Sequence, residues 1–288
     1  MWQTTPNSFL ALDQTEHSLE NSKCVILPVP FESTTSYKKG TNSGPAAIIR
    51  ASSEMEDFDS ELGTEPCQIG IHTAEALASN LSSSEAMTLT IADAVTSYIN
   101  KEKLVGVLGG EHSVSAGVVK AMSLKYEDLS ILVFDAQADL RDEYQGNSYS
   151  HACASRRMLD YAPVTIVGVR SLTKEESIFA KTSKTPVIQR FAEEITDLES
   201  ITATLSQNVY ISFDLDAFDP SLMAAVGTPE PGGLGWWEAL RIIRHVSHNR
   251  KIVGFDVVEL SPNEGPETCS YTAAKLVYKL IAYATEQK

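Results

Sequence analysis

Two apolar stretches of this sequence, residues 131–134 (ILVF) and residues 209–213 (VYISF), each run directly into closely spaced carboxylates. The oxygen-bearing side chains at alternate positions are Asp135, Gln137 and Asp139 after the first stretch, and Asp214 and Asp216 after the second. Apolar runs of this kind are typical of strands buried on both faces. Because residues two apart in an extended chain point to the same side, we expect each strand to direct its acids into one small space.

Carboxylates buried side by side raise one another's pKa or break the fold unless a cation neutralises them. Four converging carboxylates suit two divalent ions. His112 is a further candidate ligand, because it follows the apolar run Leu104–Leu108 and is freed sterically by Gly109 and Gly110. A neutral imidazole with shared carboxylates favours a first-row ion such as Mn²⁺, and the absence of a thiolate cluster in the sequence argues against a structural zinc site. Two such ions about 3.5–4 Å apart hold a bridging water and lower its pKa.

Apolar strands alternate with helical segments along the chain, which predicts an α/β fold with a largely parallel sheet. The expected strands are Cys24–Val29, Ile69–His72, Leu104–Leu108, Ile131–Phe134, Val164–Val169, Pro186–Ile188, Val209–Phe213 and Ile252–Val258. The expected helices are Pro45–Arg50, Ser82–Asn100, Val114–Lys125, His151–Leu159, Lys174–Lys181, Ala192–Leu205, Trp236–His248 and Thr272–Thr285. Residues 1–288 show no break in composition and no repeat, so we expect one domain, with residues 1–22 as a surface arm. Ligands of such sheets bind beyond the carboxyl ends of the strands, which is where the acidic segments and His112 fall.

The formal net charge of −15 argues against nucleic acid as a partner, because phosphate binding is driven by Lys and Arg. No apolar run approaches the roughly 18 residues of a membrane span, and the first residues lack the pattern of a secretory signal. The four cysteines have neither metal nor redox spacing, which indicates inert thiols in a reducing compartment. We therefore expect a cytoplasmic protein. We also expect the acidic segment Met55–Gly63 to be an exposed turn.

Five motifs occur in order: GTNSGPAAIIR at Gly40–Arg50, GGEHS at Gly109–Ser113, DAQAD at Asp135–Asp139, SFDLDAFDP at Ser212–Pro220 and GTPEPGG at Gly227–Gly233. Together they resemble the ureohydrolase family of arginases and agmatinases, and the resemblance covers most of the chain. The GTPEPGG form and the segment DLRDEY at residues 139–144 are more similar to agmatinases than to arginases. The resemblance implies a three-layer αβα sandwich with a mostly parallel central sheet. It also implies a homo-oligomer, usually a trimer or a hexamer.

The resemblance assigns a role to each site residue. The first manganese ion would be held by His112, Asp135, Asp139 and Asp214. Asp135 and Asp214 would bridge to a second ion, where Asp216 adds a ligand. Asp139 would take a proton from the bridging water and pass it to the leaving amine. His151 would shuttle protons, and Glu259 would pair with the guanidinium of a small substrate. The implied reaction is attack of a metal-bridging hydroxide on the guanidinium carbon, and agmatine would yield putrescine and urea.

Three positions leave alternatives open. Gln137 stands where the family normally has a histidine ligand of the second ion, and an amide oxygen is a weaker ligand than imidazole for Mn²⁺. We therefore expect a weak second site, so that the enzyme needs excess metal, uses another ion, or has lost turnover. Glu230 is either a second substrate anchor or an exposed loop residue. Arg141 either meets the far end of the substrate, which favours a carboxylate tail, or pairs with Asp142 or Glu143.

The leading hypothesis is therefore a manganese-dependent agmatinase. One alternative is the same chemistry on another guanidino or formimino compound, such as guanidinobutyrate or arginine. Another is a non-catalytic family member impaired at the second metal site by Gln137. Phosphatase-type chemistry is disfavoured, because the sequence shows no basic or glycine-rich phosphate cradle beside the acids.

Overall fold

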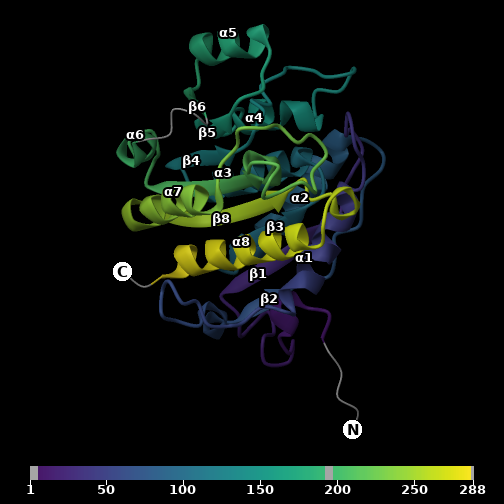
Figure 1. Ribbon diagram of the computed structural model, residues 1–288, viewed down its shortest axis with the longest axis vertical. Coiled ribbons are helices and arrows are strands. Elements are labelled where there is room, and N and C mark those ends of the chain that lie inside the picture. Colours follow the sequence, from purple (N-terminus) through teal and green to yellow (C-terminus); the bar gives the residue numbers. More distant parts are fainter. Residues whose placement is uncertain (1–5, 192–196, 287–288) are drawn as a thin grey trace.

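The computed structural model describes residues 6–191 and 197–286, which form one eight-stranded sheet with helices on both faces (Figure 1). The strands are β1 (Cys24–Val29), β2 (Ile71–Thr73), β3 (Leu104–Gly109), β4 (Leu129–Phe134), β5 (Val164–Val169), β6 (Val187–Phe191), β7 (Asn208–Asp214) and β8 (Lys251–Val258). Their order across the sheet is β2-β1-β3-β8-β7-β4-β5-β6. Within the described residues every pairing between these strands is parallel.

The helices of the described residues pack in two layers, one on each face of the sheet. They are α1 (Gly44–Ser52), α2 (Ser84–Ile99), α3 (Ser115–Lys125), α4 (Ala154–Met158), α5 (Lys174–Thr182), α6 (Leu198–Thr202), α7 (Trp236–Asn249) and α8 (Thr268–Thr285). One apolar cluster joins the sheet to α1, α6, α7 and α8, and a second cluster joins it to α2, α3, α4 and α5. The predicted three-layer αβα sandwich is confirmed. None of the described helices is both long and apolar enough to span a membrane.

Side chains along the central strands alternate between the two apolar clusters. Leu132 and Phe134 of β4 belong to the cluster under α7 and α8, whereas Ile131 and Val133 belong to the cluster under α2 and α3. Because helices cover both faces, the strands are apolar at almost every position, and this made them recognisable in the sequence.

Four neighbouring strands in the middle of the sheet, β3, β8, β7 and β4, position the candidate site. His112 follows β3, Glu259 follows β8, Asp214 ends β7 and Asp135 follows β4. Because these strands are parallel, their carboxyl ends lie along one edge of the sheet. Segments far apart in the sequence therefore meet there.

The N-terminal segment differs from the expected surface arm. Phe9 and Leu10, in a short 3-10 helix (Phe9–Ala11), are buried in the apolar cluster beside α1 and α8. The backbone N–H of Leu10 donates to Ser52 Oγ at 2.8 Å. Two large apolar side chains in a polar stretch gain free energy by burial, so the prediction is wrong for these residues. Residues 1–5 lie outside the described residues.

Two further expectations need correction. The helix expected over residues 192–205 is represented by α6 alone, and residues 192–196 lie outside the described residues. The acidic segment Met55–Gly63 is not simply an exposed turn. Asp59 is 1% exposed and its Oδ2 lies 2.8 Å from Lys279 Nζ on α8. The buried lysine compensates the buried acid, and a sequence pattern does not reveal such a distant partner.

Candidate metal centre and active site

One imidazole and four carboxylates converge at the carboxyl edge of the sheet. His112 Nδ1 lies 3.1 Å from Asp135 Oδ2 and 3.3 Å from both Asp139 Oδ2 and Asp214 Oδ2. Candidate ligand atoms fall into two groups, each within 4.8 Å, which share one carboxylate: His112, Asp135 and Asp139 in the first, and Asp135, Asp214 and Asp216 in the second. All of these side chains are buried. The structure therefore brings together every predicted anionic ligand.

The ring of His112 is oriented by a hydroxyl and a further carboxylate. Its Nε2 lies 3.1 Å from Ser212 Oγ, which donates to Asp256 Oδ1 at 2.8 Å. Because the hydroxyl has one hydrogen and gives it to Asp256, it accepts from the Nε2–H of His112. The lone pair of Nδ1 then faces the carboxylate oxygens. An Nδ1 held in this way is the arrangement of a histidine ligand with an outer hydrogen-bonding partner.

Two buried atoms at this point lack hydrogen bonds within the described residues, His112 Nδ1 and Asp135 Oδ2. They lie 3.1 Å apart and face other oxygens. A buried lone pair surrounded by carboxylate oxygens is costly unless a cation or a proton lies between them. Nitrogen and carboxylate oxygen are also the donors that first-row divalent ions accept. The residues present therefore fit a binuclear metal centre.

The pKa shifts of the cluster have the same cause. Burial, reinforced by the charge of Asp139, raises the pKa of Asp135 well above its usual value. Burial and the charge of Asp216 do the same to the pKa of Asp214. Burial opposes the charge on His112, but the three carboxylates that face its Nδ1 stabilise the protonated ring and raise its pKa well above the usual value. Without metal the cluster therefore retains protons that divalent ions would replace.

The acids reach one another through turns rather than along extended strands. β4 ends at Phe134, and Asp139 adopts a left-handed backbone conformation with φ of +50°. Asp216 lies in a 3-10 turn, where its backbone N–H donates to Asp214 Oδ1 at 2.9 Å. Glu259 also has a positive φ, +68°. This conformation costs a non-glycine residue roughly 1–2 kcal/mol, and such strain is concentrated at functional sites.

Gln137 directs one end of its amide into the cluster. One terminal atom of this amide lies 2.7 Å from Asp216 Oδ2 and 3.3 Å from Asp135 Oδ1. If that atom is nitrogen, the amide donates to both carboxylates and neutralises part of their repulsion. If it is oxygen, three oxygens converge, and only a cation makes that arrangement favourable. The position of Gln137 thus suits a weak oxygen ligand of the second ion and equally an internal hydrogen-bond donor.

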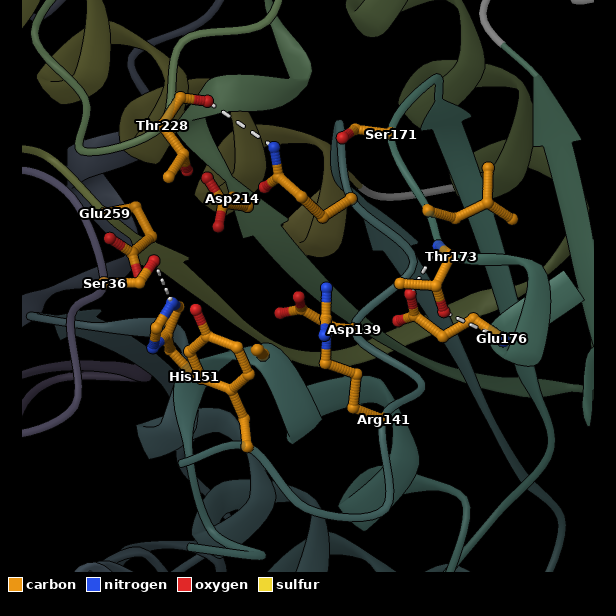
Figure 2. A pocket seen from close by; sticks show the side chains of 14 residues that line it. Ser36, Asp139, Arg141, His151, Ser171, Thr173, Glu176, Asp214, Thr228 and Glu259 are labelled. Atoms are coloured by element: carbon orange, nitrogen blue, oxygen red, sulfur yellow. Dashed lines mark hydrogen bonds between the residues drawn. The ribbon is translucent and has the colours of Figure 1, made fainter. Parts of the chain in front are cut away.

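A cavity of about 220 Å³ opens in front of the cluster (Figure 2). Asp139, His151 and Glu259 all line it. Glu259 Oε1 accepts the backbone N–H of His112 at 2.7 Å, which fixes the carboxyl beside the metal ligands. Burial and the charge of Asp214 raise the pKa of Glu259 well above its usual value. The predicted substrate-binding and proton-transfer residues thus share one cavity with the metal ligands.

Arg141 also lines this cavity, and of its two predicted alternatives the ion pair with Asp142 or Glu143 is not found among the described residues. Its guanidinium lies 4.9 Å from the centroid of the Tyr144 ring. Asp142 is instead held by Arg157 at 3.0 Å and by Arg156 at 3.5 Å. Arg141 is therefore oriented by an aromatic ring and remains available to a ligand.

Glu230 is not among the described residues that line the cavity, so its role as a second anchor lacks structural support. Sequence reasoning instead missed Arg170, which organises the loop containing Glu230. Its guanidinium donates to the carbonyl oxygens of Glu230 and Asp216, each at 2.7 Å. The same loop supplies Thr228, whose hydroxyl donates to Asp216 Oδ2 at 3.0 Å. An arginine that binds only backbone carbonyls has no motif, and this explains the omission.

The fold and the site together define a class, α/β proteins with a candidate binuclear metal centre at the carboxyl edge of a parallel sheet. Residues 22–282 match the sequence profile of the arginase family. The chain is 36% identical to the N(1)-aminopropylagmatine ureohydrolase of Synechocystis sp., over 94% of this chain and 92% of that protein. It is also 36% identical to the agmatinase of Pyrococcus horikoshii, over 91% and 92% of the two chains.

A solved structure of the agmatine ureohydrolase of Thermoplasma volcanium superposes with a TM-score of 0.87 and 30% identity, over 99% of this chain and 95% of that chain. The chain belongs to the arginase family of ureohydrolases, which hydrolyse C–N bonds in linear amidines and depend on a binuclear metal centre.

Proposed function

We propose that this protein hydrolyses agmatine to putrescine and urea. The observation that carries the proposal is the buried convergence of His112 Nδ1 with the carboxylates of Asp135, Asp139 and Asp214, next to a cavity lined by Glu259. Relatives named agmatinase or agmatine ureohydrolase support the choice of substrate. We assign His112, Asp135, Asp139 and Asp214 to a first ion. Asp216 and Gln137, together with Asp135 and Asp214, would hold a second.

Two divalent ions, which we propose to be Mn²⁺, would activate water as a nucleophile and neutralise the charge that develops in the reaction. Glu259 pairs with the guanidinium and holds its carbon over the ligand cluster, which is a proximity effect. Asp139 holds the proton that the attacking water releases and passes it to the leaving amine. His151, which lines the same cavity, exchanges a proton with the departing product.

A second candidate substrate is N(1)-aminopropylagmatine, because the Synechocystis relative carries that name. Arg141 favours a third possibility, a guanidino compound with a carboxylate tail, because its cation lines the cavity. The three candidates differ in the charge and length of the tail and share the guanidinium. The residues that contact the tail therefore decide among these substrates, whereas the residues that act on the guanidinium do not.

The test is urea release from agmatine, N(1)-aminopropylagmatine, guanidinobutyrate and arginine, measured after incubation with excess Mn²⁺. We expect the highest kcat/KM for agmatine. If the protein instead prefers guanidinobutyrate and arginine, and Arg141→Met loses that preference, the substrate would be a carboxylate-tailed guanidino compound rather than agmatine. No urea from any of the four would favour a non-catalytic role.

We also propose a homo-oligomer, a trimer or a hexamer, in the cytoplasm. The oligomer is supported by family resemblance, and the location by the four cysteines, which are all buried free thiols. Light scattering on the metal-loaded chain measures the oligomer, and a stable monomer would contradict it.

A further inference from the structure

Glu111 is a buried carboxylate beside the metal centre to which the proposed mechanism gives no task. It is 0% exposed and directly precedes His112. Its Oε2 accepts the backbone N–H groups of Ser33 and Thr34, each at 2.6 Å. Its Oε1 accepts the hydroxyls of Thr34 at 2.8 Å and Ser113 at 2.6 Å. Every one of these contacts is donated to the carboxylate, so Glu111 acts as a pure acceptor and fixes the Thr34 hydroxyl.

The hydrogen of the Thr34 hydroxyl can be assigned by counting donors. Thr34 Oγ1 has three polar neighbours: Glu111 Oε1, the backbone nitrogen of His151 at 2.9 Å and His151 Nδ1 at 3.2 Å. A hydroxyl has one hydrogen and two lone pairs. The hydrogen goes to Glu111, which only accepts, and one lone pair receives the His151 backbone N–H. The remaining lone pair can only accept, so Nδ1 must carry a proton.

The other ring nitrogen of His151 is directed toward the cavity. Its Nε2 lies 3.2 Å from Ser36 Oγ, and both residues line the cavity (Figure 2). With the proton of the neutral ring on Nδ1, Nε2 has a free lone pair and accepts from Ser36. Ser150 Oγ lies 3.3 Å from Nδ1, and its hydroxyl can accept the same proton.

We propose that Glu111, acting through Thr34, is a positioning residue that holds neutral His151 with its proton on Nδ1. The proposal rests on the proposed function, in which His151 exchanges a proton in the cavity. Nε2 is then the atom that takes the proton and returns it, while the Nδ1–H bond to Thr34 stays intact throughout. No proton travels along Glu111 and Thr34. The two residues select the tautomer and hold the ring in place.

A direct test reads the tautomer by NMR, independently of activity. The full chain is labelled with ¹⁵N-histidine and loaded with Zn²⁺, a diamagnetic first-row ion, and the tautomer is read from the neutral form of the ring; His151→Asn identifies its signals. We expect the proton on Nδ1. A proton on Nε2 of the wild-type ring would overturn the proposal, whether or not the protein proves to be an agmatinase.

Glu111→Gln should reverse the tautomer. Because two backbone N–H groups face Oε2, the amide oxygen of glutamine must occupy that side and its NH₂ must face the Thr34 hydroxyl. Thr34 then accepts from the amide and donates its own hydrogen to His151 Nδ1, which moves the ring proton to Nε2. An unchanged tautomer in this variant would contradict the role of Glu111.

Kinetics supply a second test, in which Thr34 is changed instead of Glu111, because Glu111 directly precedes the proposed metal ligand His112. Thr34→Val should lower kcat by about 10- to 100-fold, the usual effect of losing an outer hydrogen-bonding partner, with KM and metal content little changed. Thr34→Ser, which keeps the hydroxyl, should retain activity within about threefold. In a His151→Asn background, Thr34→Val should cause no further loss, because it acts through that ring. A full additional loss there would show a purely structural role.

Thr88→Val is the matched control. Thr88 is also buried, and its hydroxyl donates to Ser84 O at 3.0 Å within α2, away from the cavity. We expect its kinetics to equal those of the wild type. A loss as large as that of Thr34→Val would assign the effect to general destabilisation and overturn the proposal.

Discussion

Asp59 and Glu61 form ion pairs with a lysine of the same chain, whereas the carboxylates of the metal centre have no lysine or arginine partner among the described residues. Lys279 Nζ lies 2.8 Å from Asp59 Oδ2 and 2.6 Å from Glu61 Oε2, and Arg244 lies 2.7 Å from Glu61 Oε1. Around the metal-centre carboxylates, the ion pairs found among the described residues all involve one basic side chain, His112. These two acidic clusters therefore meet the same charge problem in opposite ways.

The pKa shifts show the consequence of this difference. Burial opposes ionisation of Asp59 and Glu61, but hydrogen bonds and charge from Lys279 hold the pKa of both below their usual values. At the metal centre burial dominates, and the pKa of Asp135 and that of Asp214 are raised. A cluster with its own lysine is neutralised within the protein and stabilises the fold. A cluster without one keeps its oxygens available for divalent ions.

The comparison predicts the largest effect for Asp216→Ala. This substitution removes one ligand of the second ion, and with it several kcal/mol of transition-state stabilisation. We expect kcat/KM to fall by at least about a thousandfold. Bound metal should fall with it, which mass spectrometry of metal content measures.

The control for this prediction is Asp93→Ala, an exposed acid on α2, which should leave both quantities unchanged. Retention of full activity in Asp216→Ala would remove Asp216 from the metal centre.

Lys279→Met should break the other cluster. It leaves Asp59 buried without its main cation, and such a loss typically costs about 3–5 kcal/mol of unfolding free energy. Urea unfolding measures the change, with the exposed Lys184→Met as control. Metal content of the folded fraction should stay the same. A loss below about 1 kcal/mol would mean that Arg244 alone compensates the acids.

Most of the fold and the ligand set could be predicted because they depend on local patterns. Buried parallel strands are apolar at most positions, and Asp135 directly follows β4 while Asp214 ends β7. The contacts that sequence reasoning missed depend on distant partners. Lys279 meets Asp59 across 220 positions, and Arg170 binds carbonyl oxygens that carry no sequence signal. The left-handed backbone of Asp139 likewise follows from tertiary packing rather than from residue type.

The two clusters should also respond to pH in opposite directions. The raised pKa values of Asp135, Asp214 and His112 mean that the folded protein binds more protons than the unfolded chain, so their stabilisation is lost as pH rises through the folded-state values. The lowered pKa values of Asp59 and Glu61 have the opposite sign, and their contribution is lost as pH falls through the folded-state values, which lie below the ordinary carboxylate range.

We therefore expect the melting temperature of the chelated protein to fall as pH rises above the ordinary carboxylate range. Divalent metal should reverse that fall, by about 2.7 kcal/mol at 100 times its Kd. Calorimetry with and without chelator measures both effects. An equal metal effect at pH 5 and pH 8 would contradict competition between protons and ions.

Gln137→His should produce the smallest change and would sharpen the comparison further. An imidazole replaces the amide that faces Asp216 and Asp135 and adds a stronger ligand for first-row ions. We expect the affinity for the second ion to rise by about tenfold, which corresponds to 1.4 kcal/mol, and activation to need less Mn²⁺. Titration calorimetry gives the number of ions bound and the dissociation constant of each.

Gln137→Ala is the matched variant. If the amide oxygen is a ligand, alanine weakens the second site. If the amide is only a donor, alanine leaves metal affinity unchanged and destabilises the metal-free protein. Equal second-site affinity in the histidine, glutamine and alanine forms would exclude residue 137 from coordination and leave the carboxylates alone to hold the second ion.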